Sequence, residues 1–213
     1  MKNSAYEVLS VLEKIAEERR GIKPKFARAD VYLTLYYIYS IGPLGRLKIA
    51  SMLGLGEASI KTLIRRLKEQ QLVETDIAAG VYLTNKGEEY IKALLSIIPP
   101  PKQLNLRELA KWDNAYALKL KKMAKKVEKI GIIDIRDNLI RYGADAALII
   151  AVKEKPVLLG AEEYYHPELD KIANTLNTQL DDLILVSWSR EPLKALKALI
   201  EEALDLVKEA IKW

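Results

Sequence analysis

The sequence contains no cysteine and only one histidine among its 213 residues. Without thiols the chain forms neither a disulfide nor a thiolate metal site, and one imidazole does not complete the usual shell of a transition metal. The histidine, His166, follows Glu162 and Glu163, but Pro167 beside it is typical of the first turn of a helix. We therefore expect no metal site and no cofactor.

The sequence also lacks the features of exported, membrane-spanning and common catalytic proteins. No apolar run reaches the roughly 20 residues that a bilayer requires, and no export-type segment is present. No glycine-rich loop suits a phosphate group, and Ser187 and Ser189 have no recognisable base or glycine-rich elbow. These absences predict a cytoplasmic protein that does not contact membranes and is not an enzyme.

The remaining composition is that of a compact protein with two small cores. Hydrophobic residues make up 50% and charged residues 30%, and 213 residues suffice for two domains of about 100 residues each. The net charge of +5 is mild, so a strong nonspecific clamp on nucleic acid is not indicated. Lysine, glutamate and isoleucine are plentiful while glutamine is scarce, a balance compatible with a heat-adapted source.

Residues 44–83 carry the most informative pattern of the chain. Apolar residues recur at helical spacing before and after Gly54-Leu55-Gly56, which predicts two short helices meeting at a glycine turn. Two strand-forming runs separated by residues 76–80 follow, and they predict a hairpin. Thr84 then stands as the expected N-cap of another helix.

These segments resemble the winged-helix transcriptional regulators of bacteria and archaea. The resemblance covers residues 27–98 and rests on the helix-turn-helix, the phrase L-x-x-x-x-L-V-E at residues 67–74 and the phrase L-T-x-x-G at residues 83–87. It implies a sequence-specific DNA-binding transcription regulator whose recognition helix, residues 57–70, enters the major groove of double-stranded DNA. The alternative is a protein-interaction adaptor that uses the winged helix for protein contacts.

The expected DNA contacts are polar and basic side chains on the two short helices. They are Arg46, Ser59, Lys61, Thr62, Arg65 and Arg66. Residues 44–72 hold six basic and two acidic residues, a net charge of +4 that attracts phosphates. The alternative is an ordinary solvated helix face.

Two positions depart from the pattern of these regulators. Gln71 stands where a glycine commonly ends the recognition helix, which predicts a less tightly capped helix end. The expected wing has no Lys or Arg between Glu74 and Leu83, so a contact between this wing and DNA is doubtful.

Pro99-Pro100-Pro101 predicts a linker at residues 99–103 between a winged-helix domain, residues 1–98, and a dimerisation or effector-binding domain, residues 104–213. The first domain is expected to begin with an amphipathic helix that ends near Gly21. The second domain reads strand, helix, strand, strand, helix, strand, helix. The segments are residues 115–121, 123–142 with a break near Gly131, 146–152, 157–159, 167–176, 182–188 and 192–211. The expected fold class is α+β, with a winged helix followed by a small α/β sandwich, ferredoxin-like (βαββαβ) with an extra C-terminal helix and with helices on one sheet face.

Residues 135–144 look like a motif of an uncharacterised archaeal family that pairs a winged helix with a small α/β domain. The architecture is also similar to archaeal feast/famine-type regulators, which implies a homodimer that senses a small-molecule effector. Arg136, Asp137 and Arg141 are the weak effector candidates, against an ordinary helical ion pair between Asp137 and Arg141. A second basic cluster either extends the DNA contact or is a solvated face. Its members are Lys119, Lys121, Lys122, Lys125, Lys126 and Lys129, set against Glu128.

Overall fold

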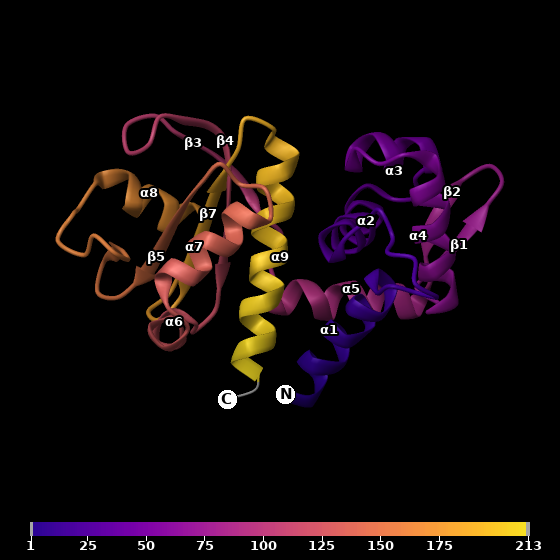
Figure 1. The fold of residues 1–213 in the computed structure, drawn as a ribbon, viewed down its shortest axis with the longest axis horizontal. Coiled ribbons are helices and arrows are strands. Elements are labelled where there is room, and N and C mark those ends of the chain that lie inside the picture. Colours follow the sequence, from indigo (N-terminus) through magenta and orange to yellow (C-terminus); the bar gives the residue numbers. More distant parts are fainter. Residues whose placement is uncertain (1, 212–213) are drawn as a thin grey trace. The chain divides into compact units, whose positions relative to one another are not determined.

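The structure is a computed structural model that describes the backbone of residues 2–211 and the side chains of residues 5–127 and 130–211. The chain divides into two compact units, Met1–Ser96 and Ile97–Trp213. The division falls just before Pro99-Pro100-Pro101 (Figure 1).

Unit 1 has the element order of a winged helix-turn-helix domain preceded by one helix. Its elements are α1 (Lys2–Ala16), α2 (Arg28–Ile41), α3 (Arg46–Leu53), α4 (Glu57–Glu69), β1 (Val73–Asp76), β2 (Gly80–Leu83) and α5 (Asn85–Ile97). β1 and β2 pair antiparallel as the wing. The winged helix predicted from the sequence is confirmed.

The corner between α3 and α4 forms as the glycine pattern predicts. Gly54 ends α3 in the left-handed region, with φ of 62°. Leu55 N then donates to Ala50 O at 3.0 Å, which closes the helix end. Leu53 and Ile60, on either side of the turn, are both fully buried, so the two helices share one core.

The L-T-x-x-G phrase has a physical basis at the junction of the wing and α5. Thr84 Oγ1 accepts a hydrogen bond from Gly87 N at 3.0 Å and donates one to Gln71 O at 2.6 Å. Thr84 is therefore an N-cap, as predicted. A Cβ atom on Gly87 would lie 1.9 Å from Leu72 O, so only glycine permits this approach of two backbones.

Gln71 adopts the conformation that glycine adopts in related helix ends. Its φ is 61°, in the left-handed region. Gln71 N nevertheless donates to Lys68 O at 2.8 Å and Leu72 N to Leu67 O at 3.0 Å, so the helix end is capped. The predicted loosening is thus absent from the hydrogen bonds, and the cost lies in the backbone conformation of a residue with a Cβ.

Gln71→Gly is expected to stabilise unit 1 by about 0.5 to 1 kcal/mol, because it removes the left-handed strain and keeps both cap hydrogen bonds. The neighbouring Gln70, with φ of −87°, is the matched control, and Gln70→Gly should destabilise the unit slightly. Urea unfolding followed by far-UV circular dichroism measures both changes. Equal losses of stability in the two variants would contradict the expectation.

Unit 2 is built around one five-stranded sheet. Its elements are β3 (Lys102–Leu106), β4 (Trp112–Leu120), α6 (Ala124–Ile130), α7 (Ile132–Arg141), β5 (Ala146–Val152), β6 (Pro156–Leu158), α8 (Pro167–Thr175), β7 (Leu183–Trp188) and α9 (Pro192–Ile211). The strand order is β3-β4-β7-β5-β6, and every neighbouring pair is antiparallel. The predicted α+β class, with a winged helix followed by a small α/β domain, is confirmed.

The sheet contains the predicted split βαβ units, but its strand order differs from that of a ferredoxin-like sheet. β4 and β5 run parallel with β7 between them, and β6 and β7 run parallel with β5 between them. The four predicted strands correspond to β4, β5, β6 and β7. A ferredoxin-like sheet places the first of these beside the third, but here the second and the fourth, β5 and β7, are adjacent. The ferredoxin-like strand order is therefore not found. β7 is buried from Leu183 to Ser187, which suits a central strand.

Helices cover both faces of this sheet, so the expectation of helices on one face is wrong. Ile184 and Val186 of β7 pack in one cluster with Leu169 and Ile172 of α8. Because strand residues alternate, the residues between them face the opposite side, where α7 and α9 pack (Figure 1). Both faces of β7 are apolar, and each requires a covering layer.

Glu168 fastens α8 to the loop after β3. Its carboxylate accepts backbone hydrogen bonds from Arg107 N at 3.1 Å and Leu109 N at 2.6 Å, and a longer one from Glu108 N at 3.3 Å. Burial alone would raise the pKa of Glu168, but the three N–H donors together hold it below its ordinary value. The ionised carboxylate is therefore part of the folded structure of unit 2.

Glu168→Gln is expected to destabilise unit 2 by about 2 kcal/mol at neutral pH, because an amide meets three N–H donors with one fewer accepting oxygen. The contribution of the carboxylate is complete above the unfolded-state pKa of about 4.3 and is lost as the pH falls through the lower folded-state pKa. The difference between the two proteins should thus shrink in acid. Fluorescence reports this unfolding, since all three tryptophans lie within residues 97–213. A constant difference between pH 7 and pH 3 would contradict the assignment.

Candidate nucleic-acid interface

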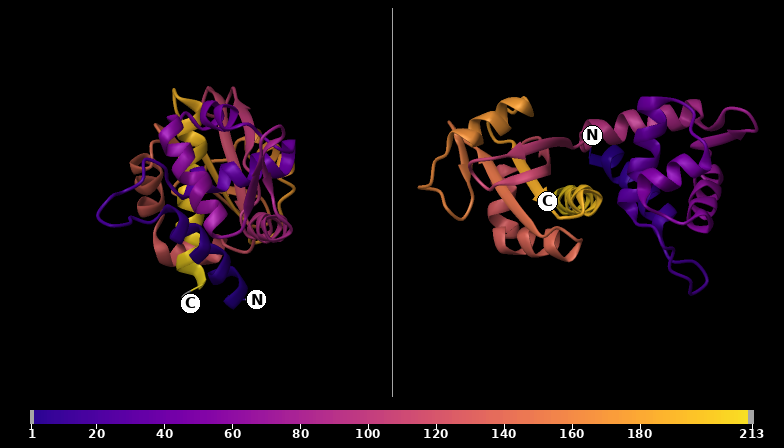
Figure 2. Two further views of the ribbon diagram at one scale, coloured as in Figure 1. Left: turned by 90° about the vertical axis from the view of Figure 1, so that its right-hand side faces the viewer. Right: turned by 90° about the horizontal axis from the view of Figure 1, so that it is seen from above.

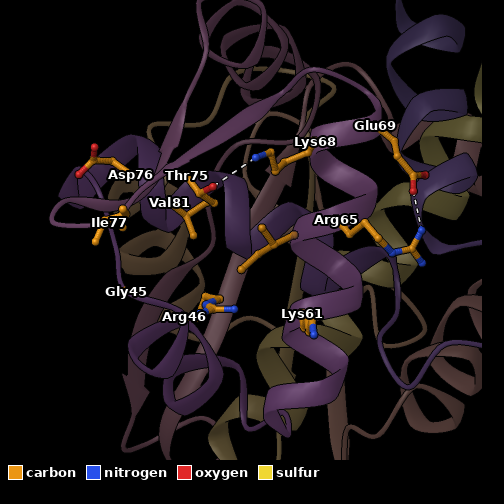
Figure 3. A pocket seen from close by; sticks show the side chains of 12 residues that line it. Gly45, Arg46, Lys61, Arg65, Lys68, Glu69, Thr75, Asp76, Ile77 and Val81 are labelled. Carbon is orange, nitrogen blue, oxygen red and sulfur yellow. Dashed lines mark hydrogen bonds and ion pairs between the residues drawn. The ribbon is translucent and has the colours of Figure 1, made fainter.

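An open groove runs between α3, α4 and the wing of unit 1 (Figure 3). Arg46, Lys61, Arg65 and Lys68 line it from the helices, and residues 75–77 line it from the wing. The helical side is therefore cationic, while the wing side includes the carboxylate of Asp76.

The buried stripe of α4 determines which side chains face outward. Ile60, Leu63 and Leu67 are fully buried, so the opposite side of the helix carries exposed Lys61 and Arg65. We call these two residues the ridge of α4. Ser59 and Thr62 lie beside the ridge and are half-buried, and Thr62 Oγ1 donates to Ala58 O at 3.0 Å.

Arg46 is the first residue of α3 and is exposed at the mouth of the groove. Figure 3 shows its guanidinium on the side of the groove that faces Lys61. Five of the six residues predicted from the sequence line grooves along α4, three of them (Arg46, Lys61 and Arg65) the groove beside the wing and Ser59 and Thr62 a second groove on the other side.

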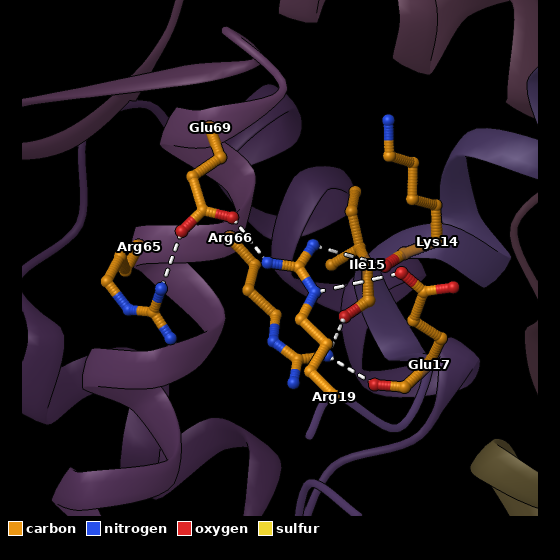
Figure 4. Close-up of polar contacts among 7 residues, drawn as sticks. All are labelled: Lys14, Ile15, Glu17, Arg19, Arg65, Arg66 and Glu69. Carbon is orange, nitrogen blue, oxygen red and sulfur yellow. Dashed lines mark hydrogen bonds and ion pairs between the residues drawn. The ribbon is translucent and has the colours of Figure 1, made fainter. Parts of the chain in front are cut away.

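The sixth predicted contact, Arg66, points into unit 1 and is a correction to the sequence prediction. Arg66 is only 4% exposed, and its guanidinium donates to Ile15 O at 2.7 Å and to Glu17 O at 2.6 Å (Figure 4). It also lies over the ring of Phe26, at 5.5 Å from the centroid. Its position next to Leu67, at the edge of the apolar stripe, explains both the inward direction and the wrong prediction.

Lys68 lines the same groove but is not among the DNA contacts predicted from the sequence. Lys68 Nζ lies 3.0 Å from the carboxylate of Glu74 and 3.2 Å from Thr75 Oγ1, so it ties α4 to the wing. Its spacing of seven residues from Lys61 places both on one side of the helix, and this spacing is the signal that could have found it.

Glu69 orders the basic side chains at the end of α4. Its two carboxylate oxygens accept from Arg19 and from Arg65, each at 2.6 Å (Figure 4). The hydrogen bond from Arg19 and the nearby positive charges hold the pKa of Glu69 below its ordinary value. The carboxylate is therefore ionised at neutral pH and holds both guanidiniums in fixed directions.

The wing itself is poor in positive charge. Asp76 accepts from the backbone N–H groups of Ala78 and Ala79, both at 2.8 Å, and these bonds lower its pKa. Ile77 at the tip is fully exposed. A turn with an ionised carboxylate and an apolar tip has no group that attracts phosphate.

The weak effector candidates lie together on α7 of unit 2. Arg136, Asp137 and Arg141 are all exposed, and none lines the groove of unit 1. Arg141 donates to Asn138 Oδ1 at 3.2 Å. In the part of the chain that the structure describes, no ion pair joins Asp137 to Arg141, so the expected helical ion pair does not form.

The second basic cluster is divided among different environments. Lys119 lies 3.7 Å from the buried carboxylate of Asp182, Lys125 lies 2.9 Å from Asp181, and Lys126 donates to Ala210 O at 3.4 Å. Lys121 and Lys122 are exposed but precede α6, so Lys122 does not share a helix face with the others. The side chains of Glu128 and Lys129 lie outside the described residues.

His166 is the N-cap of α8, and its Nδ1 accepts from Glu168 N at 3.2 Å. The prediction that this segment leads into a helix is confirmed. Among the described residues, no group of three or more carboxylate or imidazole side chains is placed to bind a metal. None of the helices in the described range combines the length and apolar character of a membrane span.

The fold and this surface define a two-domain protein with an N-terminal winged helix. Residues 29–98 match the family model described as "CggR N-terminal DNA binding domain", and residues 112–206 match "Domain of unknown function (DUF4443)". The resemblance to winged-helix transcriptional regulators, predicted from the sequence, is confirmed.

The proteins similar to this chain include a regulator and a protein of solved structure. The central glycolytic genes regulator of Priestia megaterium is 35% identical over 99 residues, which are 46% of this chain and 29% of that protein. This chain thus spans less than a third of the regulator. A solved structure, "Hypothetical protein PH0730 from Pyrococcus horikoshii OT3", is 27% identical with a TM-score of 0.67 and covers 86% of this chain and 94% of its own. That likeness extends over both units.

Proposed function

We propose that this protein is a transcription regulator that binds double-stranded DNA by inserting α4 into the major groove. The observation that carries the proposal is the exposed ridge of Lys61 and Arg65, with Arg46 facing it across an open groove. Cationic side chains on the exposed side of a helix suit phosphates and guanine edges. The match of residues 29–98 to a DNA-binding domain supports the same function.

The finer parts of the proposal concern unit 2. We propose that it forms a homodimer and responds to a small-molecule effector, with Arg136 and Arg141 of α7 as candidate ligands of an anionic group. A dimer would place two α4 helices about one helical turn apart, or a multiple of it, on a two-fold symmetric site. The operator found by selection should then contain two inverted half-sites.

The test is direct binding to duplex DNA recovered by the protein from a random-sequence pool. The dissociation constant is measured by fluorescence anisotropy at several salt concentrations, because each released counterion adds to the slope of affinity against salt. A regulator enriches a sequence motif and loses affinity steeply with salt. An adaptor that uses the winged helix for protein contacts shows neither effect, and that result would overturn the proposal.

A further inference from the structure

A short basic turn joins α1 to α2, close to α4. We call residues 19–25 the basic turn. Arg19 N donates to Ile22 O at 3.2 Å, and Ile22 N donates to Arg19 O at 3.0 Å. Between them, Arg20 and Gly21 have φ values of 53° and 75°. Two successive residues with positive φ form the tight reversal found in two-residue hairpins, so the backbone of this turn has a defined shape.

The basic turn is fastened to unit 1 at both ends. At its start, Arg19 donates to Glu69 of α4 at 2.6 Å (Figure 4). Just after its end, Phe26 is buried beneath the guanidinium of Arg66. Because Glu69 and Arg66 both belong to α4, the position of the turn is tied to the recognition helix.

The basic turn is rich in cationic side chains, three of which are exposed to solvent. Its seven residues include Arg19, Arg20, Lys23 and Lys25 and no acidic residue. Arg20, Lys23 and Lys25 are exposed, and no ion pair involves them in the part of the chain that the structure describes. Glu17, which precedes the turn, lies 3.7 Å from Nε of Arg19.

A second groove lies between the basic turn and α4. The turn contributes Arg20, Lys23 and Lys25, and the helix contributes Ser59, Thr62 and Arg65. The groove beside the wing contains Lys61, Ile64 and Lys68 of the same helix. The two grooves therefore flank the ridge of α4 on opposite sides, and the turn projects from unit 1 as a separate indigo loop (Figure 2).

We infer that the basic turn is a second DNA contact, which holds the phosphate backbone along the edge of the major groove that α4 occupies. This inference rests on the proposed function. The wing has no Lys or Arg between Glu74 and Leu83, whereas the turn presents three exposed cations on a backbone of defined shape. Phosphate contacts of this kind set the register of a recognition helix without reading sequence. The turn thus performs the clamping for which the wing is unsuited.

The first experiment removes the three exposed cations together, as Arg20→Ala, Lys23→Ala and Lys25→Ala in the full chain. The probe is a duplex of about 40 base pairs, roughly four helical turns, recovered by the unchanged protein from a random pool. We expect the slope of log affinity against log salt to fall by roughly 2 to 3, since each lost phosphate contact removes about 0.9. Sequence preference should persist, because the turn contacts no base edges.

The matched control removes three exposed lysines of unit 2, Lys153, Lys155 and Lys171, by the same change to alanine. This control separates a local contact from a general loss of net charge. Its slope of log affinity against log salt should differ from that of the unchanged protein by less than about 0.9, the effect of one phosphate contact. An unchanged slope in the turn variant, or an equal fall in the control, would overturn this inference while DNA binding stands. Failure of the unchanged protein to bind any duplex would overturn both proposals.

A second experiment uses the absence of cysteine from the chain. Lys23→Cys carries one thiol, to which an iron–EDTA group is attached, and the complex with the same duplex is allowed to cleave the DNA backbone. With the iron–EDTA group at position 23, we expect cuts in the DNA backbone next to the major groove that α4 occupies. Lys153→Cys serves as the comparison. Cleavage no stronger than from position 153 would overturn the contact.

Discussion

Replacing Lys61 and Arg65 together by alanine is expected to weaken binding to a selected duplex by roughly a hundredfold or more. Each side chain contributes about 1 to 3 kcal/mol if it contacts base edges or phosphates, and 1.4 kcal/mol corresponds to a tenfold change. Both residues are exposed on the outward side of α4, so the fold should be unaffected. The measurement is a salt-dependent titration of the duplex, in which the slope should also decrease by roughly 2 if both contact phosphates.

The control for this double variant is the loss of two charges elsewhere in unit 1. Lys86 and Lys92 lie exposed on α5, where Lys92 pairs with Glu88 at 3.4 Å. Their replacement by alanine should change the affinity by less than about tenfold, through long-range attraction alone. If both double variants lose affinity equally, α4 is not the recognition helix.

Gly87→Ala is expected to destabilise unit 1 by about 3 kcal/mol or more, the upper range for overpacking. The added Cβ would lie 1.9 Å from Leu72 O and 2.9 Å from Leu72 C, and both of these atoms belong to the backbone. Relief requires the start of α5 to move away from the residue that precedes β1, which breaks the bond from Thr84 N to Leu72 O at 3.1 Å.

Gly56→Ala is the matched comparison. Gly56 is the N-cap of α4, with φ of −71°, and nothing lies within 4 Å of the position that its Cβ would occupy. This change should alter stability by less than about 1 kcal/mol. Thermal unfolding by circular dichroism, with hydrogen exchange of residues 72–90, measures both variants. Similar midpoints would show that the junction of the wing and α5 accommodates a side chain.

Periodicity accounts for the parts of the fold that were predicted correctly. The two helices α3 and α4 follow from apolar residues at helical spacing, such as Ile60, Leu63 and Leu67, and from Gly54 at the corner. In unit 2, Pro192 at the first turn and Gly131 at the break gave α9 and the division of α6 from α7. These are local signals, which a single sequence contains in full.

The errors concern features that depend on distant parts of the chain. β3 directly follows Pro99-Pro100-Pro101, and only its pairing with β4 makes it a strand. The sequence places Arg66 at the surface because a charged residue on a helix is usually exposed, but its acceptors lie 49 and 51 residues away in the chain. The strand order of unit 2 is equally nonlocal, since apolar strands do not specify their neighbours.

The basic turn was missed for a different reason. The sequence predicts a first helix that ends near Gly21, while α1 ends at Ala16. The predicted helix end at Gly21 divides the cations of the basic turn, so the sequence pattern does not present residues 19–25 as one surface. Their relation to α4 depends on the hydrogen bond between Arg19 and Glu69, which are 50 residues apart.

The inward contacts of Arg66 have a practical consequence for excising the N-terminal module. The resemblance begins at residue 27 and the family match at residue 29, but the guanidinium of Arg66 donates to carbonyl oxygens at residues 15 and 17. A fragment that starts where the match starts leaves an interior cation without acceptors. A fragment of unit 1 that keeps both acceptors of Arg66 therefore includes α1, which packs against α4.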